Sequence, residues 1–204
     1  MPVSSRIITL LSALALLQPV RGGVAVYNVS TLAGSGVAGG TDGVGALATF
    51  SAPTLLLDDA RGVVYIAEQN GCRLRTLNIS SRAVTTLAGS GTCVDFNGVG
   101  AAAGMNQPEG FALAWPLLYV GSVNTGTRVR VVNVTSRAVR ILAGTATSAS
   151  TNGVGTAASF ANPRGVAVDA VARVLYVAEY NTCTLRALNL TTLATTTIAG
   201  SSGA

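Results

Sequence analysis

Two carboxylate and arginine combinations stand out among the residues that could take part in chemistry. Glu68 is followed by Arg75, and the same two residue types recur in the same order as Glu179 and Arg186. An enzyme usually builds its active site once, whereas these residues occur twice in similar surroundings. We therefore expect structural ion pairs rather than a reactive centre.

Asp59 and Asp169 each follow an apolar stretch that is typical of a β-strand. If both strands line a central channel, the two carboxylates could bind a ligand there. A simpler interpretation is that each carboxylate accepts hydrogen bonds from the backbone amides of the following turn. Ala114 stands at the corresponding place between them, so the sequence does not predict a uniform ring of carboxylates.

The chain contains no histidine. This excludes histidine acid/base catalysis, the Ser-His and Cys-His nucleophile pairs, and the commonest zinc ligand. The stretch "TCVDFNGVG" from Thr92 to Gly100 lacks the alternating oxygen ligands of an EF-hand, and the Gly-Val-Gly sequences lack the lysine of a phosphate-binding loop. We expect no catalytic, metal or cofactor site; a hydrolase or lyase that uses Asp59 and Asp169 is the remaining enzyme alternative.

A repeated phrase shows which elements must position these residues. "TLAGSG" occurs at Thr31 and again at Thr86, and looser copies begin at Ile141 and Thr197. Their leucine-equivalent positions are 55, 55 and 56 residues apart, which indicates a repeated structural unit. Each unit contains a Gly-Val-Gly preceded by Asp or Asn, which is typical of a turn that needs a positive φ.

Four short apolar runs follow the Gly-Val-Gly in each unit. In the third unit they are "GVAVDA", "RVLYVAE", "TLRALNL" and "LATTTIAG". Each run is short, rich in Val, Leu, Thr and Tyr, and bounded by turn residues, which favours strands over helices. Four antiparallel strands repeated in tandem predict an all-β fold made of β-propeller blades.

The units resemble the NHL repeat, in which a proline leads into an apolar strand that ends in Asp, a "YVAD"-like strand and an Asn follow, and an Arg stands among aliphatic residues. The matching stretches are "NPRGVAVD", "LYVAEYN" and "TLRAL" in the third unit. The second unit departs from the pattern, because "QPEGFALA" lacks the Asp and Ser122 replaces the glutamate. The resemblance implies a propeller, commonly six-bladed in this family, and does not imply a particular ligand.

The first 22 residues predict a secretory signal peptide. Arg6 precedes the apolar run 7–17, and this run is too short to span a bilayer. Removing residues 1–22 takes away Arg6 and Arg21 and lowers the formal charge from +5 to +3. We expect no membrane span in the mature chain, and a weak basic bias without clusters does not predict nucleic-acid binding.

The remaining residues 23–204 predict about three blades, in units at about 34–89, 90–144 and 145–200. Closed propellers have four to eight blades, so three would form a partial or open propeller. One extra strand is expected before the first blade, at residues 24–34. Two explanations stay open: the sequence is part of a longer propeller, or two copies form a homodimer that closes a six-bladed ring.

The mature segment also contains features of an extracellular protein. Cys72 and Cys93 flank the outer hairpin of the first blade, so we predict a disulfide between them and an unpaired Cys183. Four Asn-x-Ser/Thr sequons are either glycosylation sites or turn-forming asparagines, or both; they begin at Asn28, Asn78, Asn133 and Asn189.

These observations favour a secreted or cell-surface, non-catalytic binding or scaffold module. Its ligand would be a protein or a glycan on one propeller face, formed by the loops 35–48, 90–104 and 145–159. The non-catalytic alternative is that the chain is a truncated remnant of a larger NHL-repeat protein.

Overall fold

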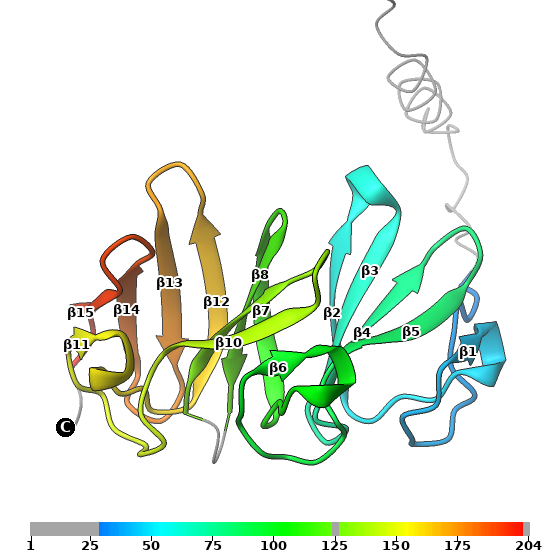
Figure 1. The fold of residues 1–204 in the computed structure, drawn as a ribbon, viewed down its shortest axis with the longest axis horizontal. Coiled ribbons are helices and arrows are strands. Elements are labelled where there is room, and N and C mark those ends of the chain that lie inside the picture. The colour runs from blue at the N-terminus through cyan, green and yellow to red at the C-terminus, as the bar shows by residue number, and fades with distance from the viewer. Residues whose placement is uncertain (1–28, 124–126, 202–204) are drawn as a thin grey trace, which may run out of the picture. The chain divides into compact units, whose positions relative to one another are not determined.

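A computed structural model describes residues 29–123 and 127–201 of the chain. The chain divides into two compact units, residues 1–30 and residues 31–204. The first unit contains the expected signal peptide and the sequon at Asn28; both lie outside the described residues. The described part of residues 31–204 forms an all-β, propeller-like fold (Figure 1).

Three antiparallel sheets follow one another along the chain, and each has the same strand order. The first contains β1 (Gly43–Val44), β5 (Ala83–Ala88), β4 (Arg73–Asn78), β3 (Val63–Glu68) and β2 (Pro53–Asp58). The second contains β6 (Gly98–Val99), β10 (Ala138–Ala143), β9 (Val129–Asn133), β8 (Leu117–Ser122) and β7 (Pro108–Ala114). The third contains β11 (Gly153–Val154), β15 (Ala194–Ala199), β14 (Thr184–Asn189), β13 (Val174–Glu179) and β12 (Pro163–Asp169).

Each sheet has five strands, whereas the sequence predicted four. The additional strand is the Gly-Val of the Gly-Val-Gly sequence, which pairs with the outermost strand of the same unit: β1 with β5, β6 with β10, and β11 with β15. The second glycine then opens a short 3₁₀ helix at a positive φ, as Gly45 does at +56° at the start of η1 (Gly45–Leu47). η3 (Gly100–Ala102) and η4 (Gly155–Ala157) repeat this arrangement.

Neighbouring sheets pack face to face through alternate residues of their strands. Tyr65 and Leu74 of the first sheet pack with Leu118 and Val120 of the second. The second and third sheets pack through a similar set that includes Tyr119 and Leu175. The core therefore lies between successive sheets, as expected when each blade buries its apolar face against the next.

The inner strands approach one another closely. A Cβ built on Gly110 of β7 would lie 1.7 Å from the carbonyl oxygen of Arg164 on β12. Only glycine tolerates this separation, so a side chain at Gly110 would force the second and third sheets apart.

The extra strand expected at residues 24–34 is not present in the described part of that segment. Residues 29–34 belong to no strand. Instead, Leu32 and Ala33 pack against the apolar face of the first sheet, and the Gly34 N–H donates to the carbonyl oxygen of Gly45 at 3.1 Å.

Candidate functional site

The two predicted ion pairs are confirmed, and both are fully buried. Arg75 and Glu68 are 3.2 Å apart, and Arg186 and Glu179 are 3.0 Å apart, with no exposed side-chain surface. Arg75 also donates to the carbonyl oxygens of Thr41 and Thr49, which lie on either side of Gly43–Val44 in the loop before Pro53–Asp58. The buried arginine therefore fastens this loop to the blade.

We call the buried arginine of each sheet, together with the loop oxygens that it binds, the arginine clasp. In the second sheet the clasp centres on Arg130, which donates to the carboxylate of Asp95 at 2.6 Å and to the carbonyl oxygen of Phe96 at 2.8 Å. Burial lowers the pKa of Arg130 below its ordinary value, and the charge of Asp95 opposes that shift. Asp95 comes from the stretch Thr92 to Gly100, which lacks the ligand pattern of an EF-hand, and its carboxylate binds arginine.

The Asp or Asn before each Gly-Val-Gly holds the outermost strand. Asp42 accepts the backbone N–H of Thr86 at 3.0 Å, Asn97 accepts that of Ile141 at 2.8 Å, and Asn152 accepts that of Thr197 at 3.0 Å. These side chains extend the pairing with the outermost strand at the position just before each two-residue strand begins. The loop that contains each Gly-Val-Gly is thus hydrogen-bonded to the outermost strand of its sheet.

Asp42 makes folding stability dependent on pH. Burial alone would raise its pKa, but the hydrogen bonds from Thr86 and the charge of Arg75 outweigh burial, so the pKa lies below the ordinary 3.8. A carboxyl with a lowered pKa in the folded state stabilises the fold above the unfolded value, and this contribution is lost as the pH falls through the folded value. We expect Asp42→Asn to reduce the loss of stability between about pH 5 and about pH 3, measured as urea midpoints.

Asp59→Asn is the matched control for Asp42→Asn, because it changes an exposed carboxyl outside the clasp. The same acid dependence in the wild type and in Asp42→Asn would contradict the role given to Asp42.

The structure gives Asp59 and Asp169 different positions. Asp169 ends β12 and its carboxylate accepts the N–H groups of Val171 and Ala172, which is the turn role considered for it. Asp58, one residue before Asp59, ends β2 and pairs with Arg61 at 3.2 Å. Asp59 instead begins the 3₁₀ helix η2 (Asp59–Arg61), because β2 is one residue shorter than β12.

The described sequons begin at the ends of strands and form turns. The Asn78 side chain accepts the N–H of Ser81, Asn133 accepts that of Ser136, and Asn189 accepts that of Thr192, each at 2.9 Å. Turn formation is therefore shown, and glycosylation of these asparagines stays a prediction.

The predicted disulfide is confirmed. Cys72 and Cys93 are bonded, with their Cα atoms 5.2 Å apart, and Cys183 is a free, exposed thiol. The bond joins the start of β4 to the loop that leads into the second sheet.

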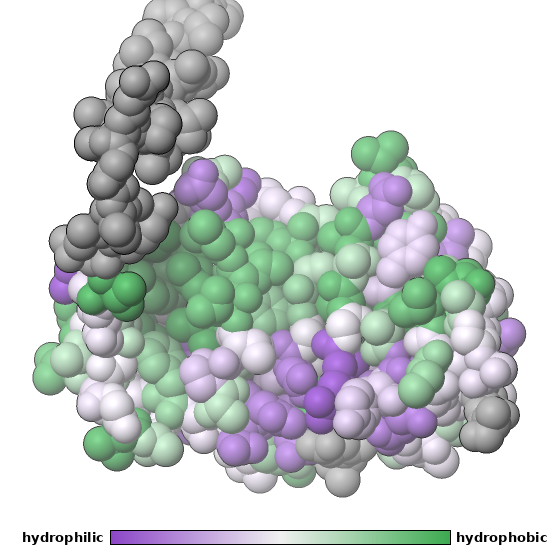
Figure 2. All heavy atoms as spheres, turned by 180° about the vertical axis from the view of Figure 1, so that it is seen from behind, coloured by the Kyte–Doolittle hydropathy of each residue, from purple (hydrophilic) through white to green (hydrophobic). Residues whose placement is uncertain are grey.

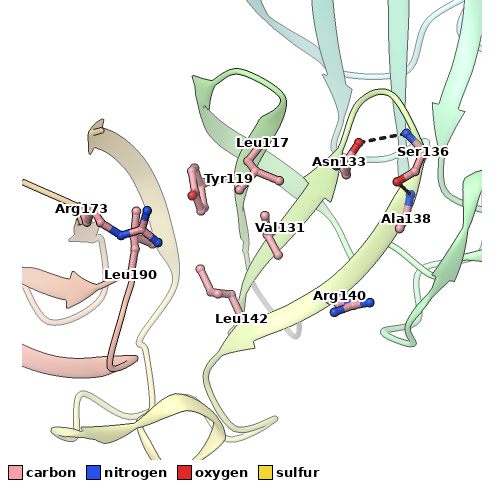
Figure 3. A pocket seen from close by; sticks show the side chains of 10 residues that line it. All are labelled: Leu117, Tyr119, Val131, Asn133, Ser136, Ala138, Arg140, Leu142, Arg173 and Leu190. Atoms are coloured by element: carbon pink, nitrogen blue, oxygen red, sulfur yellow. Dashed lines mark hydrogen bonds between the residues drawn. The ribbon is translucent and has the colours of Figure 1, made fainter. Parts of the chain in front are cut away.

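A concavity with mixed polarity lies between the second and third sheets (Figure 3). This groove has a volume of about 380 Å³. Its apolar part is formed by Leu117, Val131, Leu142 and Leu190, from both sheets. Its polar part is formed by Tyr119, Asn133, Ser136, Arg140 and Arg173.

Two exposed arginines give this groove a positive character. Arg173 stands in the β12–β13 turn, and its Nε donates to the Thr191 hydroxyl at 3.0 Å. Burial raises the pKa of Tyr119, and the positive charge of Arg173 acts in the opposite direction. None of the lining residues is a carboxylate or a cysteine, so the groove suits a ligand with an apolar part and a negative charge.

The groove is not formed by the loops from which the sequence predicted a binding face. Loops 35–48, 90–104 and 145–159 are held by the arginine clasps, although most of their residues are exposed. The groove residues come from three strands of one unit and two turns of the next. The one clue in the sequence was Asn133, which was noted as a sequon and also lines the groove.

No protein-family model matches the chain, and no curated protein matches it. Solved structures do match. A structural genomics protein of unknown function from Bacteroides thetaiotaomicron matches with a TM-score of 0.61 and 19% identity over 66% of this chain and 34% of that chain. A chain of a nidogen/laminin complex matches with a TM-score of 0.51 and 19% identity over 72% of this chain and 47% of its own.

A third match is an auxiliary nutrient binding protein from Bacteroides thetaiotaomicron, with a TM-score of 0.55 and 18% identity over 61% of this chain and 34% of that chain. The chain thus spans about a third to a half of the length of these structures. At such identities the matches show the fold alone. They support the propeller-like fold, while membership of the NHL family stays a prediction.

Proposed function

We propose that this chain is a secreted or cell-surface binding module without catalytic activity, and that the groove between its second and third sheets binds an acidic segment of a protein. The observation that carries the proposal is the lining of the groove, in which Arg140 and Arg173 accompany an apolar floor. Arginines beside apolar surface favour carboxylate ligands that also bury an aliphatic or aromatic side chain.

The other observations agree with this proposal. The Cys72–Cys93 disulfide fits an oxidising compartment. Among the described residues no helix is long and apolar enough to cross a membrane. One structural neighbour is a chain of a nidogen/laminin complex, and another is named as an auxiliary nutrient binding protein.

Glycosylation and a homodimer are further parts of the proposal. Asn78 and Asn189 stand at the ends of strands β4 and β14, where a glycan can be attached. Asn133 ends β9 and also lines the groove, so a glycan on Asn133 would compete with a ligand in the groove. Two copies would close a six-bladed ring.

A glycan with carboxylate or sulfate groups is the alternative ligand for the groove.

Charge reversal in the groove tests the ligand. We expect the double variant Arg140→Glu/Arg173→Glu to bind short labelled peptides, in which a central Leu is flanked by Asp and Glu, about tenfold or more weakly than the wild type in fluorescence anisotropy. Two attractive charge contacts become repulsive, so the difference should shrink at high salt.

Arg82→Glu is the matched control, because Arg82 is exposed but lies outside the groove. Equal binding by the wild type and the groove variant would contradict the ligand. If the groove binds sulfated or sialylated oligosaccharides and not the acidic peptides, the ligand is a glycan and the proposal of an acidic protein segment is wrong. An intracellular chain with unmodified Asn78 and Asn133 would contradict the location.

A further inference from the structure

The repeated "TLAG" phrase has a structural role at both junctions between sheets. The end of β5 packs against the second sheet, where Leu87 is 6% exposed and Ala88 is fully buried. The next residue, Gly89, donates its N–H to the carbonyl oxygen of Gly100 at 3.1 Å. Gly144 makes the same bond with Gly155 at 3.2 Å at the second junction. Each sheet therefore has a site for the end of the preceding outer strand.

The first sheet has this site too, and residues 31–34 occupy it without being part of a preceding sheet. The Gly34 N–H donates to the carbonyl oxygen of Gly45 at 3.1 Å, and Leu32 packs where Leu87 packs in the next unit. Among the described residues, 31–34 cover only a small part of the apolar face. A groove of about 320 Å³ lined almost entirely by apolar residues remains, and Leu55 beside it is 73% exposed.

Hydrophobic side chains gather over the first two sheets in the surface view (Figure 2). In the second and third sheets the positions that correspond to Leu55 by strand register are Phe111 and Val166. Both pack against the sheet that precedes them. The first sheet therefore has an apolar face that corresponds to the faces of the second and third sheets that pack against a preceding sheet.

The fourth copy of the phrase, residues 197–200, presents the other half. Ile198 is 52% exposed, although its counterpart Leu87 is 6% exposed. Tyr176 on the same face of the third sheet is 42% exposed, whereas Tyr65 and Tyr119 are 4% and 5% exposed. This face has the composition of a blade interface and has no partner among the described residues.

We infer that the groove of the first sheet receives residues 197–200 of a second copy of this chain, and that residues 31–34 compete for the same place. The inference rests on the proposed two-copy ring and names the contact that forms it. Two sets of the three described blades together make six, which lies within the range of four to eight blades of closed propellers. The contact joins different surfaces of the two copies, and such an interface forms a ring when its rotation closes.

Because residues 31–34 compete with residues 197–200 of a second copy, a change in residues 31–34 should change how strongly two copies associate. Residues 31–34 are covalently attached to the first sheet, so their local concentration opposes the incoming segment. Weakening the attached segment should therefore strengthen association, the reverse of the usual effect of a surface charge. Since Leu32 contributes one buried apolar side chain, we expect Leu32→Asp to lower the dissociation constant of the dimer by about tenfold or more.

Sedimentation of four full-length chains tests this inference: wild type, Leu32→Asp, Ile198→Asp and the double variant. We expect Leu32→Asp to form dimers at lower concentration than the wild type, and Ile198→Asp to cancel the gain. Circular dichroism confirms that each chain is folded. A Leu32→Asp chain that associates no better than the wild type would overturn the inference, and so would association that survives Ile198→Asp.

A covalent trap gives a second readout. Cys183 and Ala38 are the counterparts, one in the third unit and one in the first, of the bonded pair Cys72 and Cys93. In the inferred dimer Cys183 of one copy lies beside residue 38 of the other. Oxidised glutathione should therefore convert Ala38→Cys into a disulfide-linked dimer, taking up the two hydrogens of the thiols to give two molecules of reduced glutathione.

Ser148→Cys is the matched control, because Ser148 is the counterpart of Ala38 in the third unit and lies at an exposed loop tip. Peptide mapping should locate the link of Ala38→Cys at Cys183. Equal dimer yields from the two variants, or a link that excludes Cys183, would overturn the inference. Peptide binding in the groove that Arg140 and Arg173 line is measured separately, so failure of the dimer and failure of the proposed ligand are distinguishable.

Discussion

Replacing Glu179 with glutamine should lower the free energy of unfolding by about 3 to 5 kcal/mol, because the buried charge of Arg186 then loses its carboxylate partner. The remaining partners of Arg186 among the described residues are neutral oxygens of Asn152, Ser150 and Ser159. A loss of this size is a large share of the stability of an ordinary domain. Urea unfolding followed by circular dichroism measures it.

Glu68→Gln is the matched comparison. Arg75 keeps a second carboxylate, Asp42, at 2.6 Å, so the expected loss is about 1.5 to 3 kcal/mol, typical of one hydrogen bond to a charged group. Adding Arg186→Met to Glu179→Gln should recover part of the loss, because the unpaired charge is removed. Equal losses for the two glutamate variants would contradict the assignment of the clasps.

Removing the disulfide should have the next largest effect. Cys93→Ser opens a bond that spans 21 residues, which corresponds to about 3 kcal/mol on the chain-entropy estimate. Cys183→Ser should change the urea midpoint little, because Cys183 is exposed and unbonded. Thiol counting on the unfolded, unreduced wild type should find one free thiol, and labelling should map it to Cys183.

A different labelling pattern would contradict this assignment. Three free thiols, or a bond between Cys72 and Cys183, would show that the oxidised chain pairs its cysteines in another way. A Cys183→Ser chain that is as unstable as Cys93→Ser would lead to the same conclusion.

The sequence predicted the longer strands well because each carries its own local pattern. The period of the "TLAG" phrase and the turn residues around each apolar run locate four strands in every unit. The structural role of Glu68 with Arg75 also followed from repetition, since a pair that recurs is more readily explained by packing than by catalysis.

The fifth strands could not be predicted in this way. A two-residue strand such as β1 has no alternating pattern, and its pairing depends on Asp42 reaching the backbone of Thr86, 44 residues further along the chain. The strand expected at residues 24–34 is absent from the described part of that segment for a different reason. Its phrase matched the end of a strand, but in the described part of that segment no neighbouring strand pairs with it.

The candidate groove was missed for a related reason. Leu117, Val131 and Leu142 come from one unit, whereas Arg173 and Leu190 come from the turns of the next. Packing of the second sheet against the third brings them together, and no spacing along the chain indicates it. The loops predicted to form the binding face instead supply oxygen partners of the arginine clasps.

Hydrogen exchange of the secreted chain, with and without an acidic Leu-containing peptide, tests the central claim most directly, namely that this propeller-like chain binds ligands in the groove between its second and third sheets. The account predicts slower exchange in β8, β9, β10 and the turn that holds Arg173, and no such change in Arg140→Glu/Arg173→Glu. Protection confined to loops 35–48, 90–104 and 145–159, or no protection at a saturating peptide concentration, would contradict it.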